Sequence, residues 1–254
     1  MIGREQAIFK HDEVRPMMAP DDDTNVETIA RRAYRELRAA LMGGEFLPAT
    51  TLTLRALADR LGTSIMPIRE AVSRLAAEHA LELRPNRAIR VPELSRIEID
   101  HLWQIRLLIE SEAAGLAATA ASAAHIRALS SVCESMWQAY RASDVRAMVA
   151  GTGQWTMLLA EASGSAPFID YISNLRLRCA PLIARALEGI GPDEPFFAFS
   201  LRLQDQIVDA LQSGNAASAR DLRLADVRSF QDFVYRRLGW SGRSTSEVLP
   251  SLAR

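Results

Sequence analysis

Residues 51–91 constrain what this chain can fold into more than any other stretch of the sequence. A short segment with helical periodicity ends at Gly62, and glycine commonly ends helices because it tolerates the left-handed conformation. A second helical segment begins at Ser64, a residue type favoured at helix N-caps. Two alternating segments, 81–83 and 89–91, indicate short strands joined by a turn. This order predicts a winged helix-turn-helix, a module that lays one helix in the major groove of DNA.

The same module extends toward the N-terminus. A four-residue apolar spacing predicts a further helix, ended by Gly43 and Gly44, through Ile29, Ala33, Leu37 and Leu41. Pro67 lies in the first turn of the third helix, where its missing N–H costs nothing, and the buried side of that helix is predicted to hold Ile68, Ala71, Val72 and Leu75. We expect a DNA-binding domain over residues 25–92, after a flexible arm over residues 1–24.

The remainder of the chain has helical periodicity throughout. Glycine and proline residues divide it into six amphipathic segments: 97–121, 124–142, 144–163, 167–186, 196–213 and 216–238. Short connections between amphipathic helices favour an antiparallel arrangement. The predicted fold is therefore mostly α, with the winged helix-turn-helix followed by an antiparallel α-helical bundle over residues 93–238 and a loose C-terminal tail over residues 239–254.

The charge distribution supports a DNA-binding face, although the whole chain of 254 residues carries a net charge of only −1. Residues 25–92 contain 11 arginines and 7 carboxylates, a balance of +4. Residues 1–24 carry −3 and residues 93–254 carry −2. A basic module attached to a weakly acidic body is typical of a protein that meets phosphates with one face.

Several other classes of protein lack their sequence signatures here. The sequence contains no run of about 18 apolar residues, so it predicts no membrane span. Its N-terminus has no basic segment followed by an apolar one, so it predicts no secretory signal. We therefore expect a cytoplasmic protein. Cys133 and Cys179 have no metal-ligand spacing and are expected to be buried free thiols. We find no glycine-rich phosphate loop and no Ser/His/Asp or Cys/His arrangement, which disfavours an all-helical enzyme.

The predicted DNA interface centres on the helix that begins at Ser64. Arg69 is placed to bind guanine O6 and N7, a contact worth about 1–3 kcal/mol of discrimination. Arg55 would hold a base or a phosphate, and Arg87, with Asn86, would enter the minor groove or clamp the backbone. The alternative is that these arginines are merely solvated, but their joint position on one module favours DNA contact. The predicted DNA-binding residues are Arg55, Ser64, Ile65, Met66, Arg69, Asn86 and Arg87.

These residues carry a resemblance to a known family. The segment 52–58, followed by Gly62-Thr63-Ser64, Pro67-Ile68-Arg69-Glu70-Ala71 and Arg74-Leu75, resembles the DNA-binding domain of GntR-family repressors. The helical remainder, with Arg106 and Glu110 early and Glu161-Ala162-Ser163-Gly164 in its middle, resembles the FadR-type ligand-binding domain called FCD. The resemblance implies a transcription regulator that binds DNA as a homodimer, usually as a repressor, under the control of a small molecule.

The chain departs from the family pattern in its DNA-reading helix. The family usually places arginine and threonine after the serine, where this chain has Ile65 and Met66. One base-reading arginine is therefore absent, and the apolar side chains are suited to thymine methyl groups. Ala88 replaces the glycine of the wing. We expect the preferred operator to differ from the common operator of the family.

A second departure concerns a metal site. Most FCD domains hold a divalent metal with an aspartate, a histidine four residues later and two further histidines, a donor set suited to zinc or nickel. The matching positions in this chain are Thr152, Thr156, Gln204 and Asp226. We therefore predict no metal and no other cofactor. These four side chains either fill a degraded pocket or form hydrogen bonds with an organic effector, and the sequence favours neither alternative.

Arg106 is the best predicted anchor for an anionic effector, because it matches the family's pocket-side arginine. A salt bridge to Glu110 one turn later is an equally good interpretation of the same residue. Arg176 and Arg178 are weaker candidates. The predicted effector-binding residues are Arg106, Thr152, Thr156, Arg178, Gln204 and Asp226, and the expected effector is a small carboxylate-bearing metabolite. The alternatives are a DNA-binding regulator with a vestigial pocket and no effector, and an all-helical enzyme.

Overall fold

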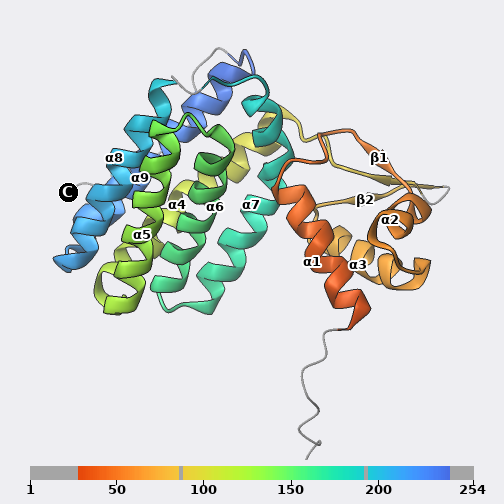
Figure 1. The fold of residues 1–254 in the computed structure, drawn as a ribbon, viewed down its shortest axis with the longest axis horizontal. Helices are drawn as coiled ribbons and strands as arrows, with labels where there is room; N and C mark the ends of the chain where they lie inside the picture. Colours follow the sequence, from red (N-terminus) through yellow and green to blue (C-terminus); the bar gives the residue numbers. More distant parts are fainter. Residues whose placement is uncertain (1–27, 86–87, 192–193, 241–254) are drawn as a thin grey trace, which may run out of the picture.

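The computed structural model describes residues 28–85, 88–191 and 194–240. Figure 1 shows a small lobe formed by the first three helices and a sheet, beside a larger lobe of long helices. The helices of the small lobe are α1 (Ile29–Met42), α2 (Leu54–Leu61) and α3 (Ile65–Ala77). Thr28 and Thr53 begin α1 and α2, since each hydroxyl accepts a hydrogen bond from a backbone N–H in the first turn. The predicted winged helix-turn-helix is thus confirmed.

The sheet of the small lobe has one strand more than the sequence predicts. Its strands are β1 (Thr51–Leu52), β2 (Glu82–Leu83) and β3 (Ile89–Arg90), in the antiparallel order β1-β3-β2. The β2–β3 hairpin is the predicted wing. β1 was not predicted because two residues are too short to show alternation, and their pairing with β3 comes from the tertiary fold.

The core of the small lobe confirms the predicted apolar faces. Buried side chains of α1, α3 and β3 form one cluster that includes Leu37, Leu41, Ile68, Leu75 and Ile89. Gly62 ends α2 in the left-handed conformation with φ of 61°. Ser64 occupies the N-cap position of α3, but its side chain forms no capping hydrogen bond, so the prediction that it caps this helix holds for its position and not for its hydroxyl.

Within the residues that the structure describes, the larger lobe has six helices at nearly the predicted bounds. They are α4 (Arg96–Ala120), α5 (Ala123–Arg141), α6 (Val145–Ala162), α7 (Ala166–Leu187), α8 (Pro195–Gln212) and α9 (Ala216–Arg237). Ser95 and Glu98 form a capping box at the start of α4. α4 packs along α9 and also contacts α6, α7 and α8, so it lies at the centre of the bundle. Its buried face therefore meets side chains from most of its neighbours.

The two lobes meet along α7, which Figure 1 shows beside α1. Leu177 of α7 is fully buried in the hydrophobic cluster of the small lobe. The guanidinium of Arg38 donates to the Ser173 hydroxyl at 2.5 Å, and the Asn174 amide donates to the Glu78 carbonyl at 3.1 Å. One helix of the bundle is thus also a part of the DNA-binding module's core.

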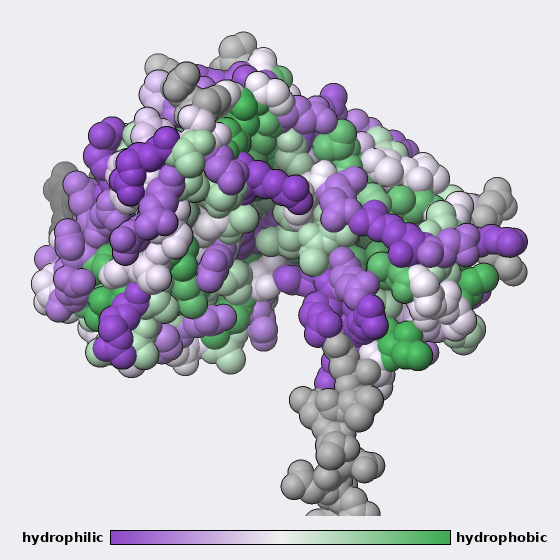
Figure 2. All heavy atoms as spheres, in the orientation of Figure 1, coloured by the Kyte–Doolittle hydropathy of each residue, from purple (hydrophilic) through white to green (hydrophobic). Residues whose placement is uncertain are grey.

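The surface and the chain ends add three observations. Figure 2 shows apolar side chains scattered among hydrophilic ones on the visible face of both lobes. Trp240, within the predicted loose tail, packs against the Tyr235 ring with a centroid distance of 5.3 Å, so packing extends at least to this residue. Cys133 and Cys179 are buried and free, as predicted. None of the helices within the described residues is long and apolar enough to cross a membrane.

Candidate functional site

The first turn of α3 presents the predicted DNA-reading side chains to solvent. Ser64 and Arg69 are exposed, and Ile65 and Met66 are 43% and 61% exposed although both are large and apolar. Arg55, in the first turn of α2, is exposed as well. The residues that follow on the inner side of α3 are buried. The amino end of α3 is therefore an uncovered surface with both charged and apolar groups.

The other arginine of α3 has a structural role. The guanidinium of Arg74 lies 3.8 Å from the centre of the Tyr34 ring and pairs with Glu78 at 3.3 Å. The Tyr34 hydroxyl also donates to the Glu78 carboxylate. By contrast, Arg69 and Arg55 form no ion pair with any residue that the structure describes. Their guanidinium groups are available for an outside partner.

The wing is described only in part. Asn86 and Arg87, the two predicted contacts in the turn, lie outside the described residues. On either side of them, the Arg84 N–H donates to the carbonyl of Ala88 at 2.9 Å, which closes the hairpin. The Arg84 side chain pairs with Glu82 at 2.5 Å. The hairpin thus has the geometry of a wing, and the roles of Asn86 and Arg87 stay predictions.

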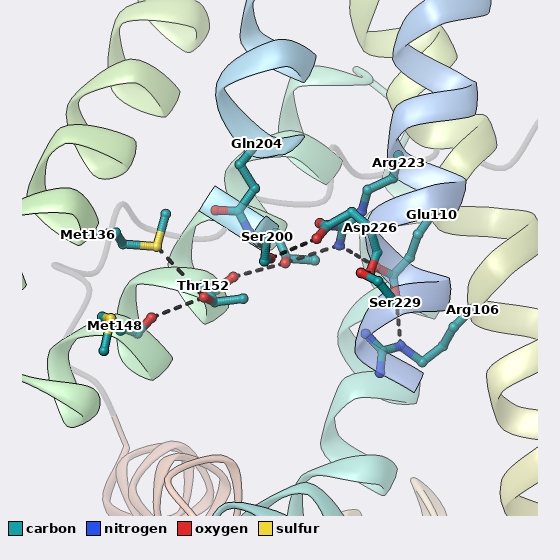
Figure 3. A network of polar contacts seen from close by, with 11 residues as sticks. Arg106, Glu110, Met136, Met148, Thr152, Ser200, Gln204, Arg223, Asp226 and Ser229 are labelled. Atoms are coloured by element: carbon teal, nitrogen blue, oxygen red, sulfur yellow. Dashed lines mark hydrogen bonds and ion pairs between the residues drawn. The ribbon is translucent and has the colours of Figure 1, made fainter. Parts of the chain in front are cut away.

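The larger lobe contains a buried centre of charged side chains, shown in Figure 3. Glu110 of α4 accepts from Arg106 Nε at 2.6 Å and from Arg223 Nη2 at 2.5 Å. Arg223 of α9 also pairs through Nη1 with Asp226 at 2.5 Å. All four side chains are at most 5% exposed. Arg106 thus forms the alternative salt bridge to Glu110, inside the bundle rather than on its surface.

Polar side chains from α6 and α8 complete this buried charged centre. The Ser200 hydroxyl donates to Asp226 at 2.8 Å, and the Gln204 amide donates to Ser200 at 3.4 Å. Arg223 donates to the Thr156 hydroxyl at 3.2 Å. Three of the predicted effector residues, Thr156, Gln204 and Asp226, therefore converge from three helices. The spacing of these residues in the sequence does not show that Arg223 links Thr156 to Asp226.

Thr152 lies at the edge of this cluster. Its hydroxyl donates to the Met148 carbonyl at 3.0 Å and lies 3.7 Å from the sulfur of Met136. Its own carbonyl accepts from Thr156 at 2.9 Å. The structure therefore links Thr152 to the buried charged centre only through Thr156, one turn along α6.

Electrostatics keep Glu110 ionised in spite of its burial. Burial alone would raise the pKa of Glu110, but the guanidinium groups of Arg106 and Arg223 outweigh it and lower the pKa to about 2. Burial would likewise lower the pKa of Arg106, and the charge of Glu110 raises it. The pKa of Asp226 is raised by burial, which outweighs its bonds to Arg223 and Ser200. Glu110 is thus the main counter-charge of the cluster.

A third arginine, Arg176 of α7, faces the same centre. Burial and the charge of Arg106 lower its pKa to about 10, and Glu110 partly offsets these effects. Its guanidinium reaches α6, where a Cβ placed on Gly153 would lie 3.0 Å from Nη2. Arg178, the predicted residue two positions later, acts instead on Glu98 and Cys179. The structure therefore brings Arg176, rather than Arg178, to the buried charged centre.

Arg223 and Arg176 are the functional candidates that the sequence analysis missed or ranked low. Arg223 lies three residues before Asp226 on α9, and this spacing places both side chains on one helical face. The spacing was visible in the sequence. The burial of this pair was not visible in the sequence, because an Arg–Asp pair three residues apart is usually a solvent-exposed ion pair.

The buried charged centre is not fully satisfied by its own members. Buried atoms without a hydrogen-bond partner include Arg106 Nη1, Arg176 Nε, Arg223 Nε and Gln204 Oε1. Each such group costs about 1–3 kcal/mol when it is left unpaired. The three guanidinium groups face two carboxylates, which leaves one positive charge in excess. The arrangement favours an additional partner that is anionic.

The same residues do not fit a divalent metal. The four positions that the resemblance predicts to match the metal ligands of FCD domains are Thr152, Thr156, Gln204 and Asp226, and they supply a single carboxylate. That carboxylate already pairs with Arg223, whose charge would repel a metal cation. No group of three or more His, Cys, Asp or Glu side chains is placed to hold a metal within the described ranges. The cation that pairs with Asp226 is therefore the guanidinium of Arg223.

A winged helix-turn-helix joined to a helical domain with a buried polar centre defines a DNA-binding regulator with a sensor domain. Residues 29–91 match the model of the bacterial regulatory proteins of the gntR family, and residues 101–228 match the FCD domain. The chain therefore belongs to the GntR family of transcription regulators, in the FadR-type group that carries an FCD domain. The resemblance stated from the sequence is confirmed.

Individual relatives agree with this assignment. The HTH-type transcriptional regulator McbR of Escherichia coli K12 is 28% identical over 167 residues, which are 66% of this chain and 76% of McbR. The solved structure of E. coli McbR/YncC superposes with a TM-score of 0.78 at 23% identity, over 83% of this chain and 99% of that one. The solved structure of a transcriptional regulator GntR from Rhodococcus sp. RHA1 superposes with a TM-score of 0.65 at 19% identity, over 84% of this chain and 99% of that one. These relatives are regulators and not enzymes.

Proposed function

We propose that this regulator represses transcription as a cytoplasmic homodimer, and that a small carboxylate-bearing metabolite bound at the buried charged centre changes its affinity for DNA. The observation that carries the proposal is the excess positive charge of that centre, together with its unpaired polar atoms. A two-fold dimer is proposed because one winged module buries too little surface to specify an operator.

The DNA contacts proposed for α3 follow from its exposed amino end. Arg69 and Arg55 are exposed and free of ion pairs within the described part of the chain. The hydroxyl of Ser64 is exposed at the N-cap position of α3, where it can donate to a phosphate oxygen beside the first N–H groups of the helix. We propose that α3 lies in the major groove, with Arg69 on a guanine.

The effector proposal follows from the charge balance. A carboxylate would accept from Arg106 Nη1 and Arg176 Nε, two donors that have no partner among the described residues. It would also neutralise the charge that Glu110 and Asp226 leave uncompensated. Gln204 Oε1 would accept from a hydroxyl or amine of the same molecule. A hydroxy acid or amino acid has this combination of groups.

The replacement Arg176→Met is expected to remove the response to the effector and to keep or raise the melting temperature. Methionine has a similar length and no charge, so an under-compensated, partly buried cation is lost. A screen of carboxylic acids by thermal shift identifies the ligand. At 100 times its Kd it would stabilise the natural protein by about 2.7 kcal/mol, or roughly 5–10 °C. The same ligand should raise the melting temperature of the Arg176→Met variant by less than about 2 °C.

The matched control for this variant is Arg178→Met. Arg178 lies two residues further along α7 and also has a buried Nε, but its charge acts on Glu98 instead of Glu110. It should keep the full thermal shift. Equal losses in the two variants would contradict the assignment to Arg176. A broad screen in which no carboxylic acid shifts the melting temperature of the natural protein would favour the second candidate function, a regulator with a vestigial pocket.

α7 is the element that we propose transmits the effector signal. Arg176 faces the buried charged centre, and Leu177, the next residue, lies in the core of the DNA-binding module. Pro181 lies inside the same helix and removes its hydrogen bond to the Leu177 carbonyl, which lowers the cost of bending there. A ligand that draws in Arg176 would therefore move the surface on which α1 and α3 rest.

The double variant with Arg38→Ala and Asn174→Ala is expected to separate sensing from DNA binding. It removes the hydrogen bonds that Arg38 donates to the hydroxyl and the carbonyl of Ser173, and the hydrogen bond that Asn174 donates to the Glu78 carbonyl. The ligand should still raise its melting temperature, but should change the Kd for operator DNA by less than about twofold, whereas coupled sites typically show about 5–150-fold. Arg146→Ala, at an exposed position of α6, is the control and should keep the coupling. A double variant that responds like the natural protein would contradict transmission through α7.

A further inference from the structure

The most unusual feature of the proposed DNA interface is its apolar character. Ile65 and Met66 are consecutive residues at the start of α3, and both side chains are exposed, at 43% and 61%. The other large apolar side chains of this helix, Ile68, Val72 and Leu75, are at most 1% exposed. Two adjacent apolar side chains in water at the end of a DNA-reading helix require an explanation, since neither contributes to the core of the module.

Helix geometry places these two side chains on either side of Arg69. Successive residues of an α-helix are rotated by about 100°, so residues 65, 69 and 66 lie at about 0°, 40° and 100° around the axis. Ile65 and Met66 also lie about 4–6 Å nearer the helix start than Arg69, at about 1.5 Å per residue. A base pair contacted by Arg69 would therefore have neighbours that face an apolar side chain.

The chemistry of the major groove leaves one favourable partner for such a side chain. Guanine, adenine and cytosine present donors and acceptors there, and an isoleucine or methionine can bond to neither. Pressing an apolar group against these atoms would strip them of water without replacing the lost bonds. Thymine alone presents a methyl group, at C5. Contact with this methyl removes apolar surface from water on both sides.

We propose that Ile65 and Met66 are specificity-determining residues, and that they recognise the C5-methyl groups of thymines adjacent to the guanine bound by Arg69. The inference rests on the proposed function, because it requires α3 to lie in the major groove. It gives the half-site a definite composition, with a guanine for Arg69 flanked by thymine on one strand or the other.

The test removes one methyl group at a time from the DNA. The full-length protein first selects its sites from a pool of randomised duplexes, and Kd is then measured for the selected site with single thymines replaced by deoxyuridine. Uracil differs from thymine only by the methyl group, so pairing and all hydrogen-bonding groups stay the same. At each contacted thymine the Kd should rise about fourfold, which corresponds to about 0.8 kcal/mol for one buried carbon.

Protein variants assign each methyl group to a side chain. Ile65→Ala should bind thymine and uracil equally at one position of the half-site, and Met66→Ala at another. Both side chains are exposed, so neither variant should lose the core of the module. Thymines outside the half-site serve as controls and should tolerate uracil in every case.

The possible outcomes separate the inference from the proposed function. Selection of a defined site that contains no thymine beside its guanine would overturn the inference, and so would a site in which uracil and thymine bind the natural protein equally. In both cases sequence-specific DNA binding would stand. A protein that selects no sequence at all would overturn the proposed function and this inference with it.

Discussion

Replacing Arg69 with alanine is expected to abolish operator-specific binding and to leave the fold intact. The side chain is exposed and has no ion-pair partner among the described residues, so its loss removes no contact within the protein. A bidentate contact between arginine and guanine contributes about 1–3 kcal/mol, or roughly 5–150-fold in Kd for each half-site. In a two-fold dimer the loss occurs twice.

The measurement is the Kd for the selected operator at one fixed salt concentration, with a scrambled duplex for comparison. Binding to the scrambled duplex should change little, because it depends mainly on phosphate contacts. Arg127→Ala is the control, since Arg127 is an exposed arginine on α5, far along the chain from α3. If Arg69→Ala and Arg127→Ala bind the operator equally well, α3 does not read the guanine with Arg69.

Replacing Glu110 with glutamine is expected to destabilise the protein by about 3–5 kcal/mol. Glutamine keeps the size of the side chain but removes the charge that Arg106 and Arg223 share. Breaking a buried ion pair on one side leaves the opposite charges buried and uncompensated, which accounts for this magnitude. The free energy of unfolding is measured by urea denaturation at constant protein concentration, because the proposed dimer would contribute to stability.

A matched control lies two residues away on the same helix. Glu112 also pairs with an arginine of α9, Arg220, at 2.8 Å, but these side chains are 46% and 40% exposed. A surface pair contributes about 0–1 kcal/mol. Glu112→Gln should therefore cost at most about 1 kcal/mol. Similar losses in Glu110→Gln and Glu112→Gln would mean that the buried charged centre adds little beyond an ordinary ion pair.

The stability difference between the natural protein and the Glu110→Gln variant should depend on pH with a definite sign. The folded-state pKa of Glu110 is lowered to about 2 from an ordinary value of 4.5. Its contribution to stability is therefore complete above about pH 4.5 and is lost as the pH falls toward 2. Asp226, whose pKa is raised, acts in the opposite direction and is present in both proteins. The stability difference between the natural protein and Glu110→Gln should shrink as the pH falls from 5 toward 3, and a constant difference would contradict the assignment.

Much of the fold could be predicted because local signals agreed with the tertiary structure. Each predicted helix of the bundle is within two residues of its observed bounds, since glycine and N-cap residues mark both ends. The exposure of Arg55, Ile65, Met66 and Arg69 also followed from helical periodicity. β1 was missed, because a two-residue strand exists only through its pairing with β3.

The residues predicted to form the effector site come together only in part, and the reason is physical. Thr156, Gln204 and Asp226 do converge, but the residues that link them are Arg223 and Glu110. A sequence shows that an arginine and a carboxylate share a helical face, but it does not show whether that face is exposed to solvent or buried. Arg223 is buried, so its ion pair with Asp226, which would contribute little on a surface, lies at the centre of the domain.

The sequence alone determined the order of the elements, their boundaries and the family, because these depend on periodicity, caps and short motifs that act over a few residues. Only the tertiary structure decided that two buried arginines and the partly buried Arg176 gather around two buried carboxylates, and that Leu177 of the bundle completes the core of the DNA-binding module. These features join residues that are far apart in the chain. They depend on burial, which sets the strength of every charge and hydrogen bond and is a property of the packed fold.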